Sequence, residues 1–208
     1  ATEWCVALSV LALSFAIGFK QRTCALLLWF GSTALFHRNN LTANPSLAYL
    51  GLLLVFCAML PRDGKMPRSF LLCAWVLLVA GYTFSGITKL ESPSWMDGSA
   101  LARLMDTPLA RGWPPRLWFL ALPAWLTQGL TWLTLALELL YLPLCLFASG
   151  RKWAWFGMVA IHAGILLLVD FADLTLGMIM MHLFVFDPRW LPRRLQTSDS
   201  HEKLPVMA

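Results

Sequence analysis

Three polar side chains share one face at the end of a long apolar run. Tyr82, Ser85 and Lys89 follow each other at positions i, i+3 and i+7, a spacing that lines them up along one side of a helix. Gly81 and Gly86 lie beside them and would let a neighbouring helix approach closely. An amine in apolar surroundings is destabilised in its charged form, so Lys89 could serve as a base near neutral pH.

Lys89 has a second interpretation, in which it carries no chemistry. A lysine at the end of an apolar helix can extend its ammonium group to the lipid headgroups and anchor the helix there. Position alone favours this anchor over the base.

Glu138 lies near the middle of another apolar run, LTLALELLYLPLCLF. A carboxylate at that depth is costly, so we expect it to face the interior, to be protonated, or to pair with Lys89 or a histidine. A proton relay or active-site role and a structural hydrogen bond between helices fit equally well. Pro143, five residues later, predicts a kink in this helix.

The histidines add candidates for acid and base chemistry. His162 lies inside an apolar run and is either an acid/base or hydrogen-bonding residue or a satisfied core histidine. Asp173 would share its face only if the helix continued through Asp170, which we do not expect. His182 is a weaker candidate. His37 opens a loop and could line the mouth of the same cavity.

The composition indicates which elements hold these residues. The 208 residues are 59% hydrophobic and 13% charged, and they include 11 Trp, as in membrane proteins whose helices are apolar all round. Apolar and polar residues do not alternate with the period of two that is typical of β-strands. The predicted fold is therefore all-α, a polytopic transmembrane helical bundle with about seven apolar segments: 4–19, 23–36, 45–60, 69–88, 124–148, 153–169 and 172–186.

Several of these runs are short, since a perpendicular span takes about 20 residues. The second and seventh are marginal and could be re-entrant. Between Lys89 and Arg116 the chain is rich in Pro and Trp. We expect an ordered non-cytoplasmic loop with short helical pieces, either a lid over a site or a plain interfacial connector.

Charge placement predicts the orientation, because cytoplasmic loops are enriched in Lys and Arg. If all seven runs cross, one side receives most of the basic residues, which indicates that this side is cytoplasmic and the amino terminus is outside. A multi-pass protein of a bacterial cell membrane fits, and the net charge of +5 requires no nucleic-acid partner. The residues on the basic side are Lys20, Arg22, Arg62, Lys65, Arg68, Arg151, Lys152, Arg189, Arg193, Arg194 and Lys203.

Other patterns exclude several chemistries. The five Cys lie in or beside apolar runs without a CxxC pair and are interpreted as small buried hydrophobic residues. No metal-ligand spacing, phosphate-binding loop or nucleophile elbow is found. We therefore expect no metal or nucleotide, and no hydrolytic chemistry.

The segment ITKLESPSWMDGSAL resembles part of the vitamin K-dependent gamma-carboxylase family and of the related HTTM membrane domain. There a hydrophobic helix ends in a lysine followed by a Trp, an acidic residue and Gly. The likeness extends to LALELLYLPLCLF, to IHAGILLLVDFADLTLGMIMM and to FDPRWLPRRL. It covers most of residues 1–195.

The resemblance implies an active site open to the non-cytoplasmic face, with Lys89 as the base and Glu138 and His162 tuning it or stabilising an oxyanion. Tyr82, Ser85, Trp95 and Asp97 would shape a pocket for vitamin K hydroquinone, a menaquinol-type quinone, or another lipid-soluble substrate. In the family, the oxidised quinol removes a proton from a peptidyl glutamate so that carbon dioxide can add.

The chain also departs from the family. The large domain that binds the protein substrate in the animal carboxylases has no counterpart in residues 1–194, which we interpret as one HTTM-like transmembrane domain followed by a disordered cytoplasmic tail at 195–208. A partner subunit could supply a soluble domain. Asn44 matches a family Asn, but Pro45 and Ser46 stand where a His is expected. Peptide carboxylation is therefore in doubt.

A non-catalytic alternative remains. The chain could be a membrane subunit, or a DoxX-like quinone-associated partner protein, embedded among membrane lipids with Lys89 as a helix anchor. Quinol-dependent turnover that requires Lys89 would separate the enzyme from this alternative.

Overall fold

The computed structural model describes residues 2–38, 45–61, 66–112 and 114–191, and these ranges contain helices without any strand. One isolated β-bridge joins Ala110 and Val169. The α-helices are α1 (Thr2–Ala16), α2 (Gln21–Arg38), α3 (Pro45–Met59), α4 (Arg68–Lys89), α5 (Pro93–Met96), α6 (Ala100–Met105), α7 (Pro114–Leu120), α8 (Ala124–Leu139), α9 (Tyr141–Leu146), α10 (Ala148–Leu168) and α11 (Ala172–Phe184). A 3-10 turn, η2, follows at Pro188–Trp190.

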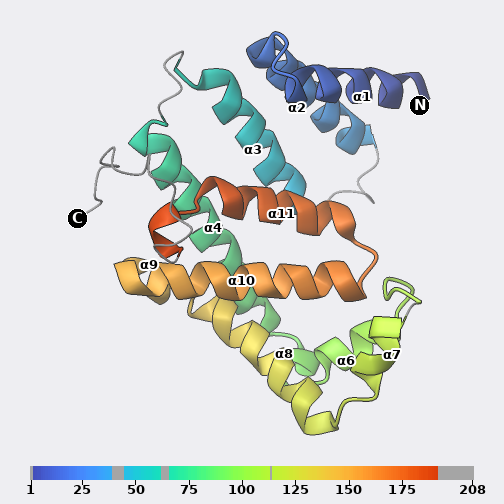
Figure 1. Cartoon of the computed structure of the whole chain (residues 1–208). Coiled ribbons are helices and arrows are strands. Elements are labelled where there is room, and N and C mark those ends of the chain that lie inside the picture. The colour runs from blue at the N-terminus through green and yellow to red at the C-terminus, as the bar shows by residue number, and fades with distance from the viewer. Residues whose placement is uncertain (1, 39–44, 62–65, 113, 192–208) are drawn as a thin grey trace.

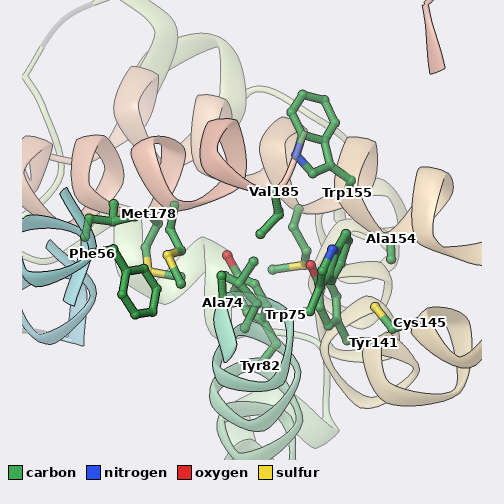
Figure 2. Packing of buried hydrophobic residues seen from close by; sticks show 14 residues of the cluster. Phe56, Ala74, Trp75, Tyr82, Tyr141, Cys145, Ala154, Trp155, Met178 and Val185 are labelled. Carbon is green, nitrogen blue, oxygen red and sulfur yellow. The ribbon is translucent and has the colours of Figure 1, made fainter. Parts of the chain in front are cut away.

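Helix α4 is the central element of the fold. Its buried residues include Ala74, Leu78, Tyr82 and Gly86, which recur every four positions and so form one stripe along the helix. The stripe packs into the main cluster of buried residues, to which α3, α9, α10 and α11 also contribute (Figure 2). The same stripe that buries α4 therefore carries Tyr82 into the protein interior.

The remaining helices surround α4 in two groups (Figure 1). Helix α1 packs on α2, α2 on α3, and α3 on α11. On the other side, α8 and α9 pack on α4, and α10 lies beside α11. The indole Nε1 of Trp155 in α10 donates a hydrogen bond of 2.7 Å to the backbone oxygen of His182 in α11. This bond fixes α10 and α11 together at the depth of Tyr82.

The apolar run predicted at 124–148 is not one helix. It divides into α8 and α9, which meet at Leu140, and α10 begins soon afterwards at Ala148. Pro143 explains the break, because a proline cannot donate to the carbonyl four residues before it, here that of Leu139. The expected kink therefore lies at the end of α8. Glu138 is in the last turn of α8, one residue before that end.

The Pro- and Trp-rich segment after Lys89 contains the short helices α5 and α6, as expected. Gly98 joins them with a φ of +79°, a left-handed conformation that glycine adopts without strain. The indole of Trp132 in α8 donates to the Met96 carbonyl at 3.2 Å. Farther along, the backbone N–H of Arg111 donates to Leu168 O, and that of Asp170 donates to Leu109 O. The segment is thus attached to α8 and, farther along, to the end of α10.

Only part of the predicted membrane topology is supported. Among the described residues, one helix, α4, is long and apolar enough to cross a membrane. The bent pair of α7 and α8 could supply a second span, although the two helices meet at 105°. Helices α1, α3 and α11 have 15, 15 and 13 residues, which correspond to only about 20 Å of rise each. Seven crossings therefore remain a prediction.

Two smaller expectations can be compared with the structure. Cys24 and Cys145 are buried, but Cys5 and Cys73 are exposed, so burial does not hold for all five cysteines. Cys5 lies on α1, a helix without buried residues, which explains its exposure. The tail predicted at 195–208 lies outside the described residues.

Candidate functional site

The ammonium group of Lys89 lies at the end of α4 and is paired with Glu138 of α8. Lys89 Nζ is 2.6 Å from Glu138 Oε2, and it also donates a hydrogen bond of 2.6 Å to Ser85 Oγ one turn earlier. The Glu138 side chain is 9% exposed and the Lys89 side chain 21%. The pairing expected for the buried carboxylate is therefore present, and the lysine side chain as a whole is partly accessible. Lys89, Glu138 and Ser85 are called the ion-pair layer below.

The ion pair lies where the C-terminal ends of two helices meet. A helix carries partial negative charge at its C-terminus, which favours Lys89 in the last turn of α4 and disfavours Glu138 in the last turn of α8. The lysine offsets the unfavourable position of the glutamate. The two helices can meet here because Gly86 lies against Leu139. A close approach of a neighbouring helix was predicted from this glycine.

Trp95 of α5 completes the surroundings of the lysine. Its ring centroid is 5.0 Å from Lys89 Nζ, within the range of a cation–π contact. Asp97 lies two residues farther on and is exposed, and its Oδ1 accepts a hydrogen bond of 2.8 Å from the backbone N–H of Ser99. Hydrogen bonding to Ser99 lowers the pKa of the Asp97 carboxyl group. The structure thus brings Trp95 to the lysine and leaves Asp97 as a turn residue at the surface.

A second group of polar side chains lies one turn deeper in α4. The hydroxyl of Tyr82 is 2.8 Å from His162 Nε2 and 2.7 Å from His182 Nε2. Its ring also packs against that of Tyr141, with 4.8 Å between the ring centroids. These four residues, Tyr82, Tyr141, His162 and His182, are called the tyrosine–histidine layer. All four are buried. Since Tyr82 precedes Ser85 by three residues, the two layers are separated by about 4.5 Å along α4.

Two members of this layer had weak or no support in the sequence analysis. His182 is fully buried and hydrogen-bonded to Tyr82, although its place near the end of an apolar run made it the weaker histidine. Tyr141 was not identified. No spacing signal marks it, because the break at Leu140 separates Tyr141 from the helix of Glu138. Figure 2 shows Tyr141 next to Tyr82 in the buried cluster.

Other predicted residues are not brought to these layers. His37 is exposed in the last turn of α2, and Figure 1 shows α2 on the opposite side of the molecule from α8. Asn44 lies outside the described residues. Asp173 begins α11 after a break that ends α10 at Leu168, so the predicted separation of Asp173 from the helix of His162 is confirmed.

The two layers supply proton-transfer groups within an apolar core. The ion-pair layer offers an amine and a carboxylate in direct contact, and the layer below offers a phenol between two imidazoles. Over the described residues, no group of three or more His, Cys, Asp or Glu side chains has a geometry that could hold a metal ion.

Comparison of the chain with known families and structures gives no assignment. No family model matches it, and neither a curated protein nor a solved structure shows significant similarity. The function therefore has to be argued from the site itself.

Proposed function

We propose that the chain is an integral membrane protein that uses the ion-pair layer to take a proton from a lipid-soluble hydroxyl compound of the hydroquinone class. The observation that carries the proposal is the placement of Lys89 Nζ, 2.6 Å from both Glu138 Oε2 and Ser85 Oγ, in a side chain that is 21% exposed. The proposal agrees with the gamma-carboxylase-like segment around Lys89, which by resemblance carries the base.

Membrane insertion is supported by α4 and by the distribution of charge around it. Its 22 residues correspond to a rise of about 32 Å, close to the thickness of the hydrocarbon core. Arg68 begins the helix and Lys89 ends it. Large apolar side chains such as Leu72, Val76 and Phe84 are exposed along α4, as expected for a surface in contact with lipid. Further spans would come from the shorter apolar helices α1, α3 and α11.

The lysine can act as a base only after it has lost its own proton, and Glu138 is the group that can accept it. Transfer from Nζ to Oε2 across 2.6 Å converts an ammonium–carboxylate pair into a neutral amine and a carboxylic acid. The free amine can then remove a proton from a hydroxyl group and hold it, and the resulting ammonium stabilises the oxyanion that is left.

The residues present fit a hydroquinone. Trp95 offers an aromatic face beside the amine. Trp95 and Lys89 would hold the ring and its hydroxyl group, and Ser85 would keep Nζ in place. When bound, a hydroquinone supplies an ionisable hydroxyl group and two electrons for oxygen. The chain's own task is to bind the ring, orient the hydroxyl group and accept its proton.

One observation favours a non-catalytic role, and it defines the alternative. A lysine paired with a glutamate is also the ordinary way to bury two charges between helices. In this alternative the chain is a membrane subunit or a quinone-associated partner, and the ion pair joins α4 to α8.

The proposal is tested with Lys89→Ala and Lys89→Arg in the purified full chain, by measuring quinol-dependent oxygen consumption with a menaquinol analogue. Both variants should lose activity by about 100-fold or more, because a guanidinium group cannot be deprotonated in a protein. Lys152→Ala is the matched control, since its ammonium lies over the ring of Trp153 on another helix and should leave turnover unchanged.

Two outcomes would contradict the proposal. Equal turnover in the Lys89 variants and the wild type would eliminate a lysine base. A wild-type protein that binds no quinone by fluorescence quenching of its tryptophans, and turns none over, would leave the subunit as the better explanation.

A further inference from the structure

A second site lies at the opposite end of α4 from Lys89. A cavity of about 450 Å³ is enclosed by the start of α4, the start of α10 and the chain that follows α11. Three guanidinium groups line it, those of Arg68, Arg151 and Arg189. Its other walls are mostly apolar and aromatic, and they include Leu71, Trp75, Phe184, Phe186 and Trp190. The cavity is called the arginine pocket below.

The arginine pocket carries a net positive charge. Asp187 is the single carboxylate in its lining, and it is already paired with Arg189, with 2.6 Å between Asp187 Oδ2 and Arg189 Nη2. Arg151 Nε donates to the backbone oxygen of Cys145 at 2.8 Å, which orients its side chain. Arg68 is exposed, and its guanidinium group forms no ion pair with a described carboxylate. Two guanidinium groups therefore remain without a counter-ion among the residues that the structure describes.

The position of the pocket is informative as well. Figure 1 shows the starts of α4 and α10 and the end of α11 on one side of the molecule, so three residues assigned to the basic side by sequence order meet in one place. Arg68 is about 32 Å of helix away from Lys89. If α4 crosses the bilayer, the arginine pocket lies at the level of the headgroups of one leaflet, with its apolar walls directed toward the acyl chains.

We infer that the arginine pocket binds the headgroup of an anionic phospholipid. Guanidinium groups pair with phosphate oxygens in a two-point geometry, and basic pockets between membrane helices hold anionic headgroups on the cytoplasmic side. The aromatic and aliphatic walls accommodate the first part of an acyl chain. The inference rests on the proposed membrane location but not on the chemistry of Lys89, so it can fail while the base mechanism stands.

The test is native mass spectrometry of the full chain in detergent, titrated with phosphatidylglycerol and, separately, with phosphatidylcholine. The wild type should retain phosphatidylglycerol in preference to phosphatidylcholine. Arg68→Gln should weaken phosphatidylglycerol binding by about fivefold, the effect of one arginine near an anionic surface, and leave phosphatidylcholine unchanged. Arg68→Lys keeps the charge and should retain most of the preference. Lys152→Gln, next to Arg151 but outside the lining, is the matched control.

Arg151→Gln provides a second variant if Arg68→Gln does not fold, and should show the same selective loss. The inference is overturned if the wild type binds both lipids equally, or if Arg68→Gln and Lys152→Gln weaken phosphatidylglycerol to the same extent. Complete displacement of the lipid by inorganic phosphate would also overturn it, because the pocket would then recognise a free anion without contribution from the acyl chains.

Discussion

Gly86 of α4 and Leu139 of α8 approach each other so closely that a methyl group on Gly86 would force Leu139 to shift. A Cβ atom built on Gly86 would lie 3.0 Å from the backbone nitrogen of Leu139 and 3.1 Å from its side chain. Leu139 is the residue after Glu138, and Gly86 is three residues before Lys89. Glycine at position 86 therefore permits the close approach of the two helices beside the ion pair.

Gly86→Ala should separate α4 from α8. We expect a loss of about 1–3 kcal/mol in stability through overpacking, together with a fall in any Lys89-dependent activity. Thermal unfolding in detergent measures the first effect. Gly129→Ala is the control, because a Cβ there meets nothing within 4 Å, and it should stabilise α8 by about 0.5–1 kcal/mol. Equal effects of the two substitutions would show that the close approach has no energetic role.

Removing one partner of the ion pair should cost more than removing both. Glu138→Leu leaves the Lys89 ammonium group without its carboxylate and should destabilise the protein by about 2 kcal/mol, whereas Lys89→Met combined with Glu138→Leu should recover at least half of that loss. A double-mutant cycle followed by thermal unfolding measures the coupling. Additive losses would indicate that the two charges are solvated independently.

Tyr82→Phe should be costly and Tyr141→Phe nearly neutral. The first change removes the hydroxyl group from between two buried imidazoles and leaves both Nε2 atoms unsatisfied, at a cost of about 1–3 kcal/mol. The second removes a hydroxyl group that has no hydrogen bond to a described protein atom, so the change in stability should stay within about 0.5 kcal/mol. The two rings are in contact and both are buried, which makes the pair well matched. The reverse order would contradict the proposed hydrogen bonds.

Asp187 should make the turn after α11 sensitive to acid. Burial acts to raise the pKa of its carboxyl group, but hydrogen bonds from Arg189 outweigh it, and the pKa is lowered from the ordinary value of 3.8. A lowered pKa means that the contribution to stability is fully present above about pH 4 and is lost as the pH falls through the folded-state pKa. The difference in melting temperature between wild type and Asp187→Asn should shrink on acidification. A difference that is independent of pH would show that the carboxylate is not the titrating group.

The same substitution also bears on the arginine pocket. Asp187→Asn removes its one carboxylate and releases Arg189, so the preference for phosphatidylglycerol should increase at neutral pH. A decrease would mean that Asp187 is needed to hold Arg189 in position.

The ion-pair layer could be predicted from the sequence because its members have local or strongly constrained signals. Tyr82, Ser85 and Lys89 share a face through helical spacing alone, and a glutamate in an apolar run must find a partner. The partner was predicted as either Lys89 or a histidine, and the structure selects Lys89. Gly86 was predicted to permit a close approach of a neighbouring helix, and α8 is that neighbour.

The tyrosine–histidine layer could not be predicted in the same way. His162 and His182 lie 80 and 100 residues from Tyr82, and their convergence depends on how α10 and α11 are placed across α4, which no local pattern encodes. The extent of the helices was likewise misjudged at 124–148, where Pro143 ends α8 earlier than an uninterrupted apolar run suggests. The arginine pocket arises from three helix ends that are distant in sequence.

The hydroxyl group of Tyr82 has a single proton for two imidazole neighbours. It can donate to one Nε2 and must accept from the other, so when both histidines are neutral they have opposite tautomers. Exchanging the two roles reverses the direction of the hydrogen-bond chain without moving any heavy atom. It does require one Nδ1 to lose a proton and the other to gain one. Both Nδ1 atoms are buried without a hydrogen-bond partner among the described residues, so this conformation offers no donor or acceptor for that exchange and the direction of the hydrogen-bond chain stays fixed.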